Sequence, residues 1–489
     1  MRPKPVSAAC AVLLLCLFSL GCNGGSPFTA GGGSNVTTPP LPTPVSTPVT
    51  TNTGPTAPLS VMISDPAACK SPSGPLSHVY ITVADVMAST NPDAPGGDAS
   101  FVDLTPGLTA APQQVDLMGQ ADSRCFLAAL SVSKQVAAGN YQQVRIFLAP
   151  DSAASRVSNN ACGASYANCV VRTDNSLYDL QLTAAAANGF EVSAASLAGG
   201  GIGIDAGDTP TVDVNFDVCS SILLTADGGY EFNPVLHAGL IPSSGSTISG
   251  TVVSSATGQA LAGGHVIIAL EQKDASTGID RILMRTAASS TGTFTLCPVP
   301  TGTYDIVAVG VDGANVSYSA GVETGIQSGQ VAGDIPLVPG SGEGTLQGLV
   351  TSQSGGLQLA GLPVAVQADA LEQLPGGGAT ITVPLLPSYS PYNAAMLTAG
   401  TSSCPAGADC ASYSMRLPTS APNVVACSEQ TAPFQQQSNS PDYAAETRAD
   451  IAGSGSTADC RQPTLQGSAI ALNPSQSVTS ATLAFTQCE

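Results

Sequence analysis

Histidine is the usual general base in nucleophilic hydrolysis, and this chain of 489 residues contains three: His78, His237 and His265. A nucleophile needs such a base within hydrogen-bond reach and a third group that orients the base. The sequence has no Gly-x-Ser-x-Gly elbow, no His-Glu-x-x-His motif and no phosphate loop ending in Gly-Lys-Ser/Thr. Each histidine begins, ends or enters an expected strand, so we predict structural positions for all three and no catalytic residue.

A group of aspartates offers a second kind of chemistry. Its members are Asp205, Asp208, Asp213 and Asp217. Such acids could hold calcium, but their spacing does not fit an EF-hand loop. In the alternating run 212–218, Asp213 and Asp217 lie opposite the face of Val214, which favours a solvated acidic face on a half-buried antiparallel strand. We predict no metal site and no cofactor, with calcium binding left open, as is a carboxylate pair for glycosidic hydrolysis.

Cysteine spacing indicates disulfides rather than a metal centre. No Cys-x-x-Cys pair occurs, and no histidine stands at ligand spacing to a cysteine. The candidate pairs are Cys162–Cys169, Cys404–Cys410, Cys69–Cys125, Cys427–Cys460 and, across a domain boundary, Cys219–Cys297. The first two would close short loops. An odd number of cysteines follows Cys22, so at least one thiol is expected to stay unpaired or to pair between chains.

Tyrosines provide the candidate surface for ligand contact, because the chain has no tryptophan. The four tyrosines in or near expected loops are Tyr318, Tyr389, Tyr392 and Tyr413. If exposed, these rings could stack on sugars or on a partner protein. The alternative is that they pack a loop against a β-sandwich.

Composition excludes several classes of partner. The net charge of −20 leaves no basic stripe for a phosphate backbone, so we predict no nucleic-acid partner. The same charge disfavours adsorption to anionic lipid, so membrane attachment should depend on a covalent lipid anchor. The length allows about three domains.

Residues 1–21 have the pattern of a secretory signal, in which Arg2 and Lys4 precede an apolar run that ends before Gly21 and Cys22. This resembles the lipobox of bacterial lipoproteins, although Ser19 stands where leucine is more usual. The resemblance implies a lipid (palmitate) on Cys22 and a bacterial cell-envelope location. Asn23 and Gly24 lack the aspartate that retains some lipoproteins in the inner membrane, which favours anchoring in the outer membrane, on its periplasmic or surface face. Residues 22–57, rich in Pro, Thr, Gly and Ser, would then form a disordered linker that holds the following domains away from the membrane.

Residues 58–240 read as β-strands. Among the runs that show this are 59–64, 78–83, 141–148 and 212–218, each β-branched, aromatic or alternating in pattern. In order and spacing, the segments 64–69, 101–106, 114–117, 138–145 and 233–237 resemble the bacterial lipoprotein family called domain of unknown function 4382. The resemblance implies an exported β-sandwich-like domain, and it carries over no catalytic residue.

Two further units are expected. In residues 245–340, the runs 248–252, 290–296 and 299–306 resemble the carboxypeptidase-regulatory-like domain, a prealbumin-like sandwich of the carbohydrate-binding-like fold. Residues 345–489 repeat this pattern less faithfully, because 346–350 echoes 248–252 and 359–366 echoes 261–267. Two inserts interrupt the repeat, at 376–410 and 430–455. The second is polar and is predicted to be a mobile loop.

The sequence therefore predicts an all-β chain of tandem antiparallel β-sandwiches behind a lipoprotein signal and a linker. The function it favours is that of a non-enzymatic cell-envelope lipoprotein with structural, adhesive or ligand-binding roles. Its partners would be the membrane, through the anchor, and a polysaccharide or an envelope protein. A carbohydrate-binding surface module is the alternative, and an exported hydrolase is the third hypothesis, which requires a cleft with two acids of shifted pKa.

Overall fold

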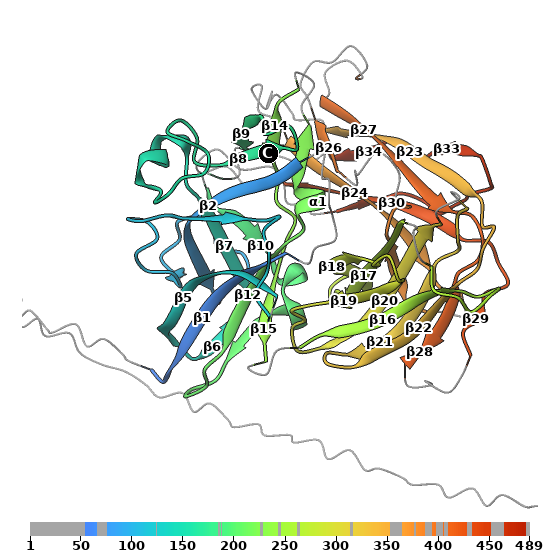
Figure 1. Ribbon diagram of the computed structural model, residues 1–489, viewed down its shortest axis with the longest axis horizontal. Helices are drawn as coiled ribbons and strands as arrows, with labels where there is room; N and C mark the ends of the chain where they lie inside the picture. The colour runs from blue at the N-terminus through green and yellow to red at the C-terminus, as the bar shows by residue number, and fades with distance from the viewer. Residues whose placement is uncertain are drawn as a thin grey trace, which may run out of the picture. The chain divides into compact units, whose positions relative to one another are not determined.

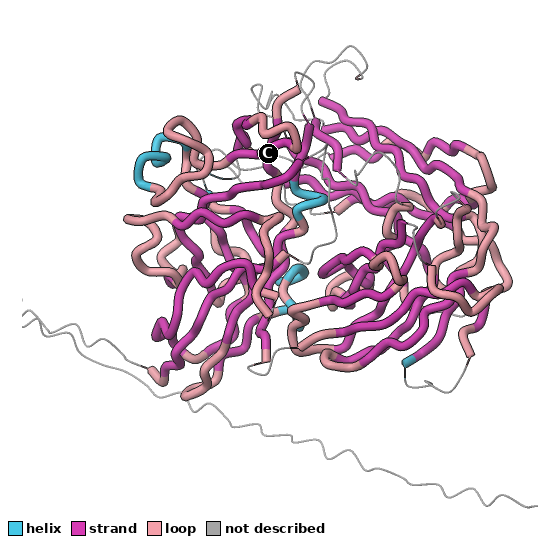
Figure 2. The backbone as a smooth tube through the Cα atoms, viewed as in Figure 1, coloured by secondary structure: helices cyan, strands magenta, loops and turns pink. Residues whose placement is uncertain are grey.

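The computed structural model describes residues 54–65, 76–123, 125–183, 186, 188–224, 228–242, 246–261, 265–312, 316–352, 364–375, 378–386, 394–397, 404, 409–427, 433–450 and 464–485. The chain divides into two units, Met1–Asn52 and Thr53–Glu489, and the described residues belong to the second. Strands dominate this part of the chain, with few short helices (Figure 2). The predicted all-β class is confirmed.

The N-terminal part of the second unit contains two main sheets (Figure 1). The β1 sheet has the order β15-β12-β1-β5, with β1 (Thr56–Ser64), β5 (Phe126–Ala137), β12 (Thr211–Phe216) and β15 (Leu236–Ile241). The β2 sheet follows the order β10-β7-β2-β8-β9-β14-β13, with β3 and β4 also paired to β2. Its strands are β2 (Leu76–Ser89), β3 (Val102–Asp103), β4 (Gln113–Asp116), β7 (Gln143–Leu148), β8 (Cys169–Arg172), β9 (Leu177–Leu182), β10 (Phe190–Val192), β13 (Ile222–Leu224) and β14 (Tyr230–Phe232). One core joins the two sheets, and Ile63, Ile81 and Phe216 are fully buried in it.

Short elements complete this part. A two-stranded ribbon pairs β6 (Gly139–Tyr141) with β11 (Ile202–Ile204). The helices are α1 (Val218–Ser221) and the 3-10 turns Asp151–Arg156, Ala194–Ser196 and Ala198–Gly200. Helix α1 begins where the alternating run 212–218 ends, and its N-cap residue Asp217 accepts hydrogen bonds from the backbone and hydroxyl of Ser220.

The C-terminal part contains three sheets among its described residues. The β16 sheet has the order β19-β16-β22, with β16 (Ile248–Ser254), β19 (Thr293–Leu296) and β22 (Val331–Leu337). The β23 sheet contains β23 (Glu343–Ser352), β27 (Asp409–Pro418), β33 (Ser477–Thr479) and β34 (Leu483–Phe485). The long sheet contains β17 (His265–Lys273), β18 (Ile279–Ala287), β20 (Thr303–Val311), β21 (Gly321–Gln327), β24 (Val364–Gln373), β25 (Thr380–Val383), β26 (Ala394–Leu397), β28 (Asn423–Ala426), β29 (Gln435–Gln436), β30 (Asp442–Asp450), β31 (Leu465–Gln466) and β32 (Ile470–Ala471).

The long sheet joins the second and third predicted segments. Strand β18 pairs with β25, and β21 pairs with β28, both in parallel. Because side chains alternate along a strand, the sheet contributes to two cores. Ile268 and Ile306 pack into the core that contains the β16 sheet, whereas Val307 and Val309 pack into the core that contains the β23 sheet. The two C-terminal sandwiches therefore share one sheet.

Part of the predicted mobile loop at 430–455 is a strand, so that prediction was wrong for this stretch. Strand β30 pairs with β24 over eight positions, from Ala365↔Asp450 to Glu372↔Tyr443. Tyr443 and Ala445 are buried in the core. Glu446, which follows Ala445 on the opposite face of the strand, is buried too, in an ion pair with Arg281. The charged side chains of β30 give it a polar composition like that of a loop, which explains the error.

Contacts tie the N-terminal part to the β16 core. Cys125 forms a disulfide with Cys297, 172 positions away in sequence. The Thr301 amide donates to the Leu240 carbonyl at 3.1 Å. A Cβ on Gly239 would lie 2.8 Å from the Cβ of Pro300, so only glycine permits this close approach.

Candidate functional site

Two of the three histidine side chains are described, those of His78 and His237. His78 lies on β2, where its Nδ1 is 2.7 Å from an Asp116 carboxylate oxygen and its ring stacks on Tyr80. His237 lies on β15, and burial lowers its pKa to about 3, with the charges of Arg448 and Arg285 acting in the same direction. A group with so low a pKa is a weak proton acceptor at neutral pH. The side chain of His265 lies outside the described residues.

Asp213 of β12 and Asp217, just after it, are both buried, so the prediction of a solvated acidic face was wrong. Asp213 is 1% exposed, and the Ser64 hydroxyl donates to its carboxylate at 2.7 Å. Asn215, two residues on, donates to the same hydroxyl oxygen at 3.0 Å. Burial raises the pKa of Asp213 to about 8, against the lowering effect of the Ser64 hydrogen bond. Strand β12 lies between β1 and β15, pairing with β1 in parallel, and Asp213 and Asn215 on its polar face are both buried.

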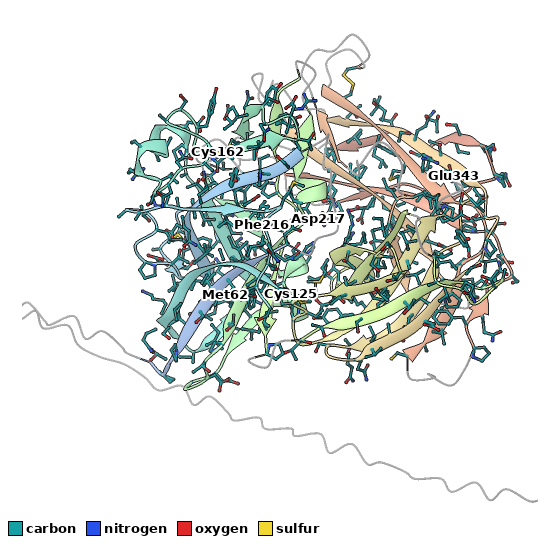
Figure 3. All side chains as sticks on the ribbon, in the orientation of Figure 1. Met62, Cys125, Cys162, Phe216, Asp217 and Glu343 are labelled. Atoms are coloured by element: carbon teal, nitrogen blue, oxygen red, sulfur yellow. A yellow bond between two sulfur atoms is a disulfide. The ribbon has the colours of Figure 1, made fainter. Side chains whose placement is uncertain are left out.

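An ionic chain continues from β12 toward the long sheet. Arg285 of β18 lies 3.2 Å from the carboxylate of Asp217, which lies beside Phe216 in Figure 3, and donates to the Ser220 hydroxyl at 2.7 Å. On β24, burial alone would raise the pKa of Asp369, but Arg448 at 2.9 Å and Arg285 hold that pKa below its ordinary value. These pairs are buried or partly buried, so the loss of one partner would leave a charge without compensation.

The acids predicted as a calcium alternative do not come together. Asp205 and Asp208 are exposed, whereas Asp213 and Asp217 are buried. Within the described ranges, no group of three or more His, Cys, Asp or Glu side chains is arranged to hold a metal ion.

Two of the cysteine pairs predicted from the sequence are confirmed, and two were wrong. The short-loop pairs Cys162–Cys169 and Cys404–Cys410 are both disulfides. The predicted Cys69–Cys125 and Cys219–Cys297 pairs were wrong, because Cys125 bonds Cys297. Cys69 and Cys460 lie outside the described residues, so the Cys427–Cys460 pair stays a prediction. Cys22 also lies outside them.

The tyrosines proposed for ligand contact are not exposed where they are described. Tyr413 is 6% exposed, and its hydroxyl hydrogen-bonds the Ser480 hydroxyl inside the β23 core. Tyr318 is 5% exposed and lies in the β16 core. Stacking on a sugar is therefore wrong for these two, because strand packing covers both rings. Tyr389 and Tyr392 lie outside the described residues.

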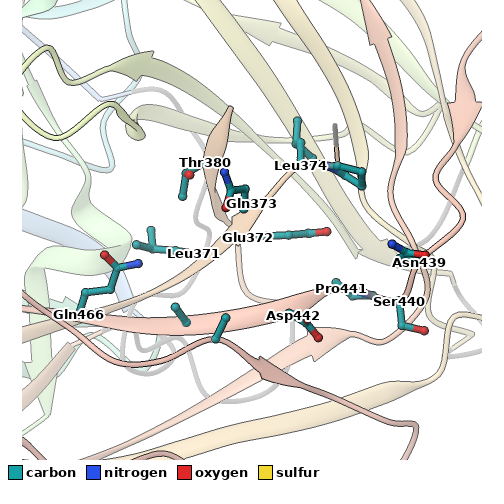
Figure 4. A pocket seen from close by; sticks show the side chains of 13 residues that line it. Leu371, Glu372, Gln373, Leu374, Thr380, Asn439, Ser440, Pro441, Asp442 and Gln466 are labelled. Carbon is teal, nitrogen blue, oxygen red and sulfur yellow. The ribbon is translucent and has the colours of Figure 1, made fainter. Parts of the chain in front are cut away.

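A pocket of about 500 Å³ lies where β24 and β30 pair, and we call it the β24–β30 pocket (Figure 4). Leu371 and Leu374, with prolines and alanines, give it apolar walls. Its polar side chains include Glu372, Gln373, Asn439, Ser440, Asp442 and Gln466. In Figure 4 the carboxyl end of Glu372 extends toward the side on which Asn439 lies.

Glu372 is a buried acid of this pocket. It is 3% exposed, and burial raises its pKa to about 8, with Asp442 acting in the same direction. Its Oε2 is buried without a hydrogen-bond partner among the described residues. A buried carboxyl oxygen without a partner carries a desolvation cost, which a bound donor would offset.

Sequence reasoning missed this pocket. Glu372 and Asp442 are 70 positions apart and meet only because β24 and β30 pair. No local signal distinguishes Glu372, because β24 also contains Gln367, Asp369 and Gln373. The hydrolase hypothesis requires two acids in a cleft, and this pocket holds two, Glu372 and Asp442.

The fold and pocket define an all-β, disulfide-bonded protein with buried ionic contacts between its strands. Residues 56–234 match the family described as Domain of unknown function (DUF4382). No curated protein matches the chain. No helix among the described residues is long and apolar enough to cross a membrane.

Solved structures give weak matches. A leucine-rich repeat protein from Bacteroides thetaiotaomicron VPI-5482 matches at 11% identity and TM-score 0.21, over 50% of this chain and 27% of that one. The Bacillus anthracis TIE protein matches at 10% identity and TM-score 0.16, over 87% of this chain and 51% of that one. The shaft pilin SpaA from Lactobacillus rhamnosus GG matches at 14% identity and TM-score 0.16, over 59% of this chain and 98% of that one. At these TM-scores the matches carry no argument about function.

Proposed function

We propose that this chain is a lipid-anchored protein of the bacterial cell envelope that presents a cross-linked β unit for structural or adhesive work without catalysis. The observation that carries the proposal is the set of three disulfides among the described residues. Disulfides persist in oxidising compartments and are rare in the cytosol, so they support export. One of them, Cys125–Cys297, links the DUF4382 segment to the β16 core and would resist separation of the two under load.

The N-terminal sequence supports the anchor. Cys22 stands at the position that a lipoprotein peptidase would expose, and residues 22–57 separate it from the first strands. A single acyl chain holds a protein only marginally, so stable attachment requires more than one chain on Cys22. A Pro/Thr-rich tether behaves as a semi-rigid spacer, which suits a unit held away from a membrane.

A binding role that depends on tyrosine platforms has less support, because Tyr318 and Tyr413 are buried. A hydrolytic role also has less support. His237 is a weak base, and Glu372, at 3% exposure, offers little surface to a polymeric substrate. These points, which come from the described residues, favour the structural or adhesive role.

Replacement of Cys22 by alanine in the full-length chain, produced in a bacterial host, should move the protein from the membrane fraction to the soluble envelope fraction. The wild-type chain should remain with the membrane after a high-salt wash, because acyl chains do not depend on charge. Fractionation followed by immunoblotting measures this. Cys427→Ala, which removes a cysteine far from the signal, is the control and should stay membrane-bound. Equal retention of the wild-type and Cys22→Ala chains, with removal of the signal from both confirmed by N-terminal sequencing, would contradict lipid anchoring.

A further inference from the structure

We propose that the β24–β30 pocket binds the primary ammonium group of a small organic ligand. The two ionisable side chains described in its lining are the acids Glu372 and Asp442, and no lysine, arginine or histidine lines it among the described residues. Its other polar side chains are amides and hydroxyls, including Asn439, Ser440 and Gln466. Ammonium has three donors and no acceptor, so carboxylate and amide oxygens match it.

Glu372 provides the observation that points to a ligand. Its carboxyl group is almost completely buried, and Oε2 has no hydrogen-bond partner among the described residues. It lines the pocket and extends into it from β24, with its carboxyl end turned toward Asn439 (Figure 4). A donor bound beside Oε2 would remove the cost of leaving that oxygen without a partner.

The size and walls of the pocket set the kind of molecule that carries the ammonium. A volume of about 500 Å³ suits a small molecule or one side chain, and Leu371, Leu374 and Pro441 offer apolar contact to its body. An alkyl amine, an amino sugar and a lysine side chain all combine a primary ammonium with such a body. A neutral sugar lacks the charge, and its usual aromatic platform is not among the described lining residues.

Binding of an ammonium group should also change the protonation of Glu372. Burial raises the pKa of Glu372 to about 8, so below that pH the empty pocket holds a protonated carboxyl. The ionisable groups that face it come from β30: Asp442, which favours the protonated form, and Tyr443, the register partner of Glu372, whose own pKa is raised by burial. A bound ammonium would favour the carboxylate. Binding at pH 7 should therefore release a proton from Glu372 to the buffer, and affinity should rise from pH 6 to pH 8.

Isothermal titration calorimetry of the purified full-length chain tests this with three amines: n-butylamine, glucosamine and Nα-acetyl-lysine amide. Titrations in two buffers of different ionisation enthalpy measure the released proton. We expect saturable binding of at least one amine and no binding of n-butanol or glucose. For n-butylamine and Nα-acetyl-lysine amide, whose amines stay protonated over this range, Kd should be several-fold lower at pH 8 than at pH 6. The amine that binds most tightly identifies the body that the pocket accepts.

Two glutamine variants assign the binding to the pocket. Glu372→Gln keeps the shape and removes the charge, so Kd should rise at least tenfold and the released proton should disappear. Glu323→Gln is the control: Glu323 is also a buried glutamate whose pKa is raised by burial, and it lies outside the pocket. Its Kd should be unchanged. The proposal is overturned if no amine binds the folded chain, if n-butanol binds equally well, or if Glu372→Gln, folded by circular dichroism, keeps wild-type affinity.

Discussion

The free energy of unfolding should be highest near pH 5 and should fall by several kcal/mol by pH 8. Buried carboxyl groups cause this, because burial raises the pKa of Asp213 and Glu372 to about 8 and that of Glu231 and Glu323 to about 7. In the unfolded chain these acids titrate near pH 4. Between pH 5 and 8 the folded state therefore binds more protons than the unfolded state, and stability decreases as pH rises. Asp213 alone would account for roughly 4 kcal/mol over this interval.

His237 changes the stability in the opposite direction. Its pKa of about 3 in the fold lies below the ordinary value near 6.5, so the unfolded state binds the extra proton between those values. This group adds stability as pH rises toward 6.5, which opposes the carboxyl groups but is outnumbered by them. Urea unfolding midpoints measured from pH 4 to pH 9 test the net effect of the carboxyl groups and His237 on stability. Asp213→Asn should flatten the slope above pH 5, whereas Asn at the exposed Asp208 should not. A midpoint that rises steadily from pH 5 to pH 8 would show that these acids are not buried as described.

Arg281→Met should lower the free energy of unfolding by about 3–5 kcal/mol, because it leaves a buried carboxylate without its partner. Arg281 of β18 binds both carboxylate oxygens of Glu446 on β30, and its Nε lies 3.6 Å from Asp274. Arg281 is 6% exposed and Glu446 2% exposed. The pair connects strands that are 165 positions apart in sequence. Chemical denaturation of the two chains under the same conditions measures the loss.

A second substitution separates the ion pair from the packing of the arginine. Adding Glu446→Leu to Arg281→Met removes the stranded charge, so most of the lost stability should return. Arg156→Ala is the control, since Arg156 is exposed and donates to the Thr109 carbonyl. It should cost less than about 1 kcal/mol. If Arg281→Met behaves like Arg156→Ala, the β18–β30 contact is not a buried one.

Local pattern predicted much of the fold. The alternation of Val212, Val214 and Phe216 identifies β12, and the β-branched run 78–83 lies inside β2. Period-two alternation says which residues share a face, but not whether solvent or another layer covers that face. That is why the buried side of Asp213 was predicted to be solvated. The same limit applies to β30, whose Glu446 and Arg448 read as loop residues until their partners on β18 and β24 are known.

Long-range pairing could not be read from the sequence. The spacing of Cys162 and Cys169 indicates a short loop, whereas Cys125 and Cys297 are brought together only by the packing of separate sheets. The pocket has the same origin, because Glu372 and Asp442 come from strands that pair across a long interval. Side chains that meet through topology leave little local signal.

The central claim, an exported unit that is covalently linked across its parts, is tested most directly at Cys125. Peptide mapping under non-reducing conditions, on the full-length chain isolated from bacterial envelopes and alkylated before digestion, measures the state of this cysteine. The account predicts a cross-linked peptide that contains Cys125 and Cys297 and that disappears after reduction. Recovery of both cysteines as alkylated thiols in the unreduced sample would contradict the claim.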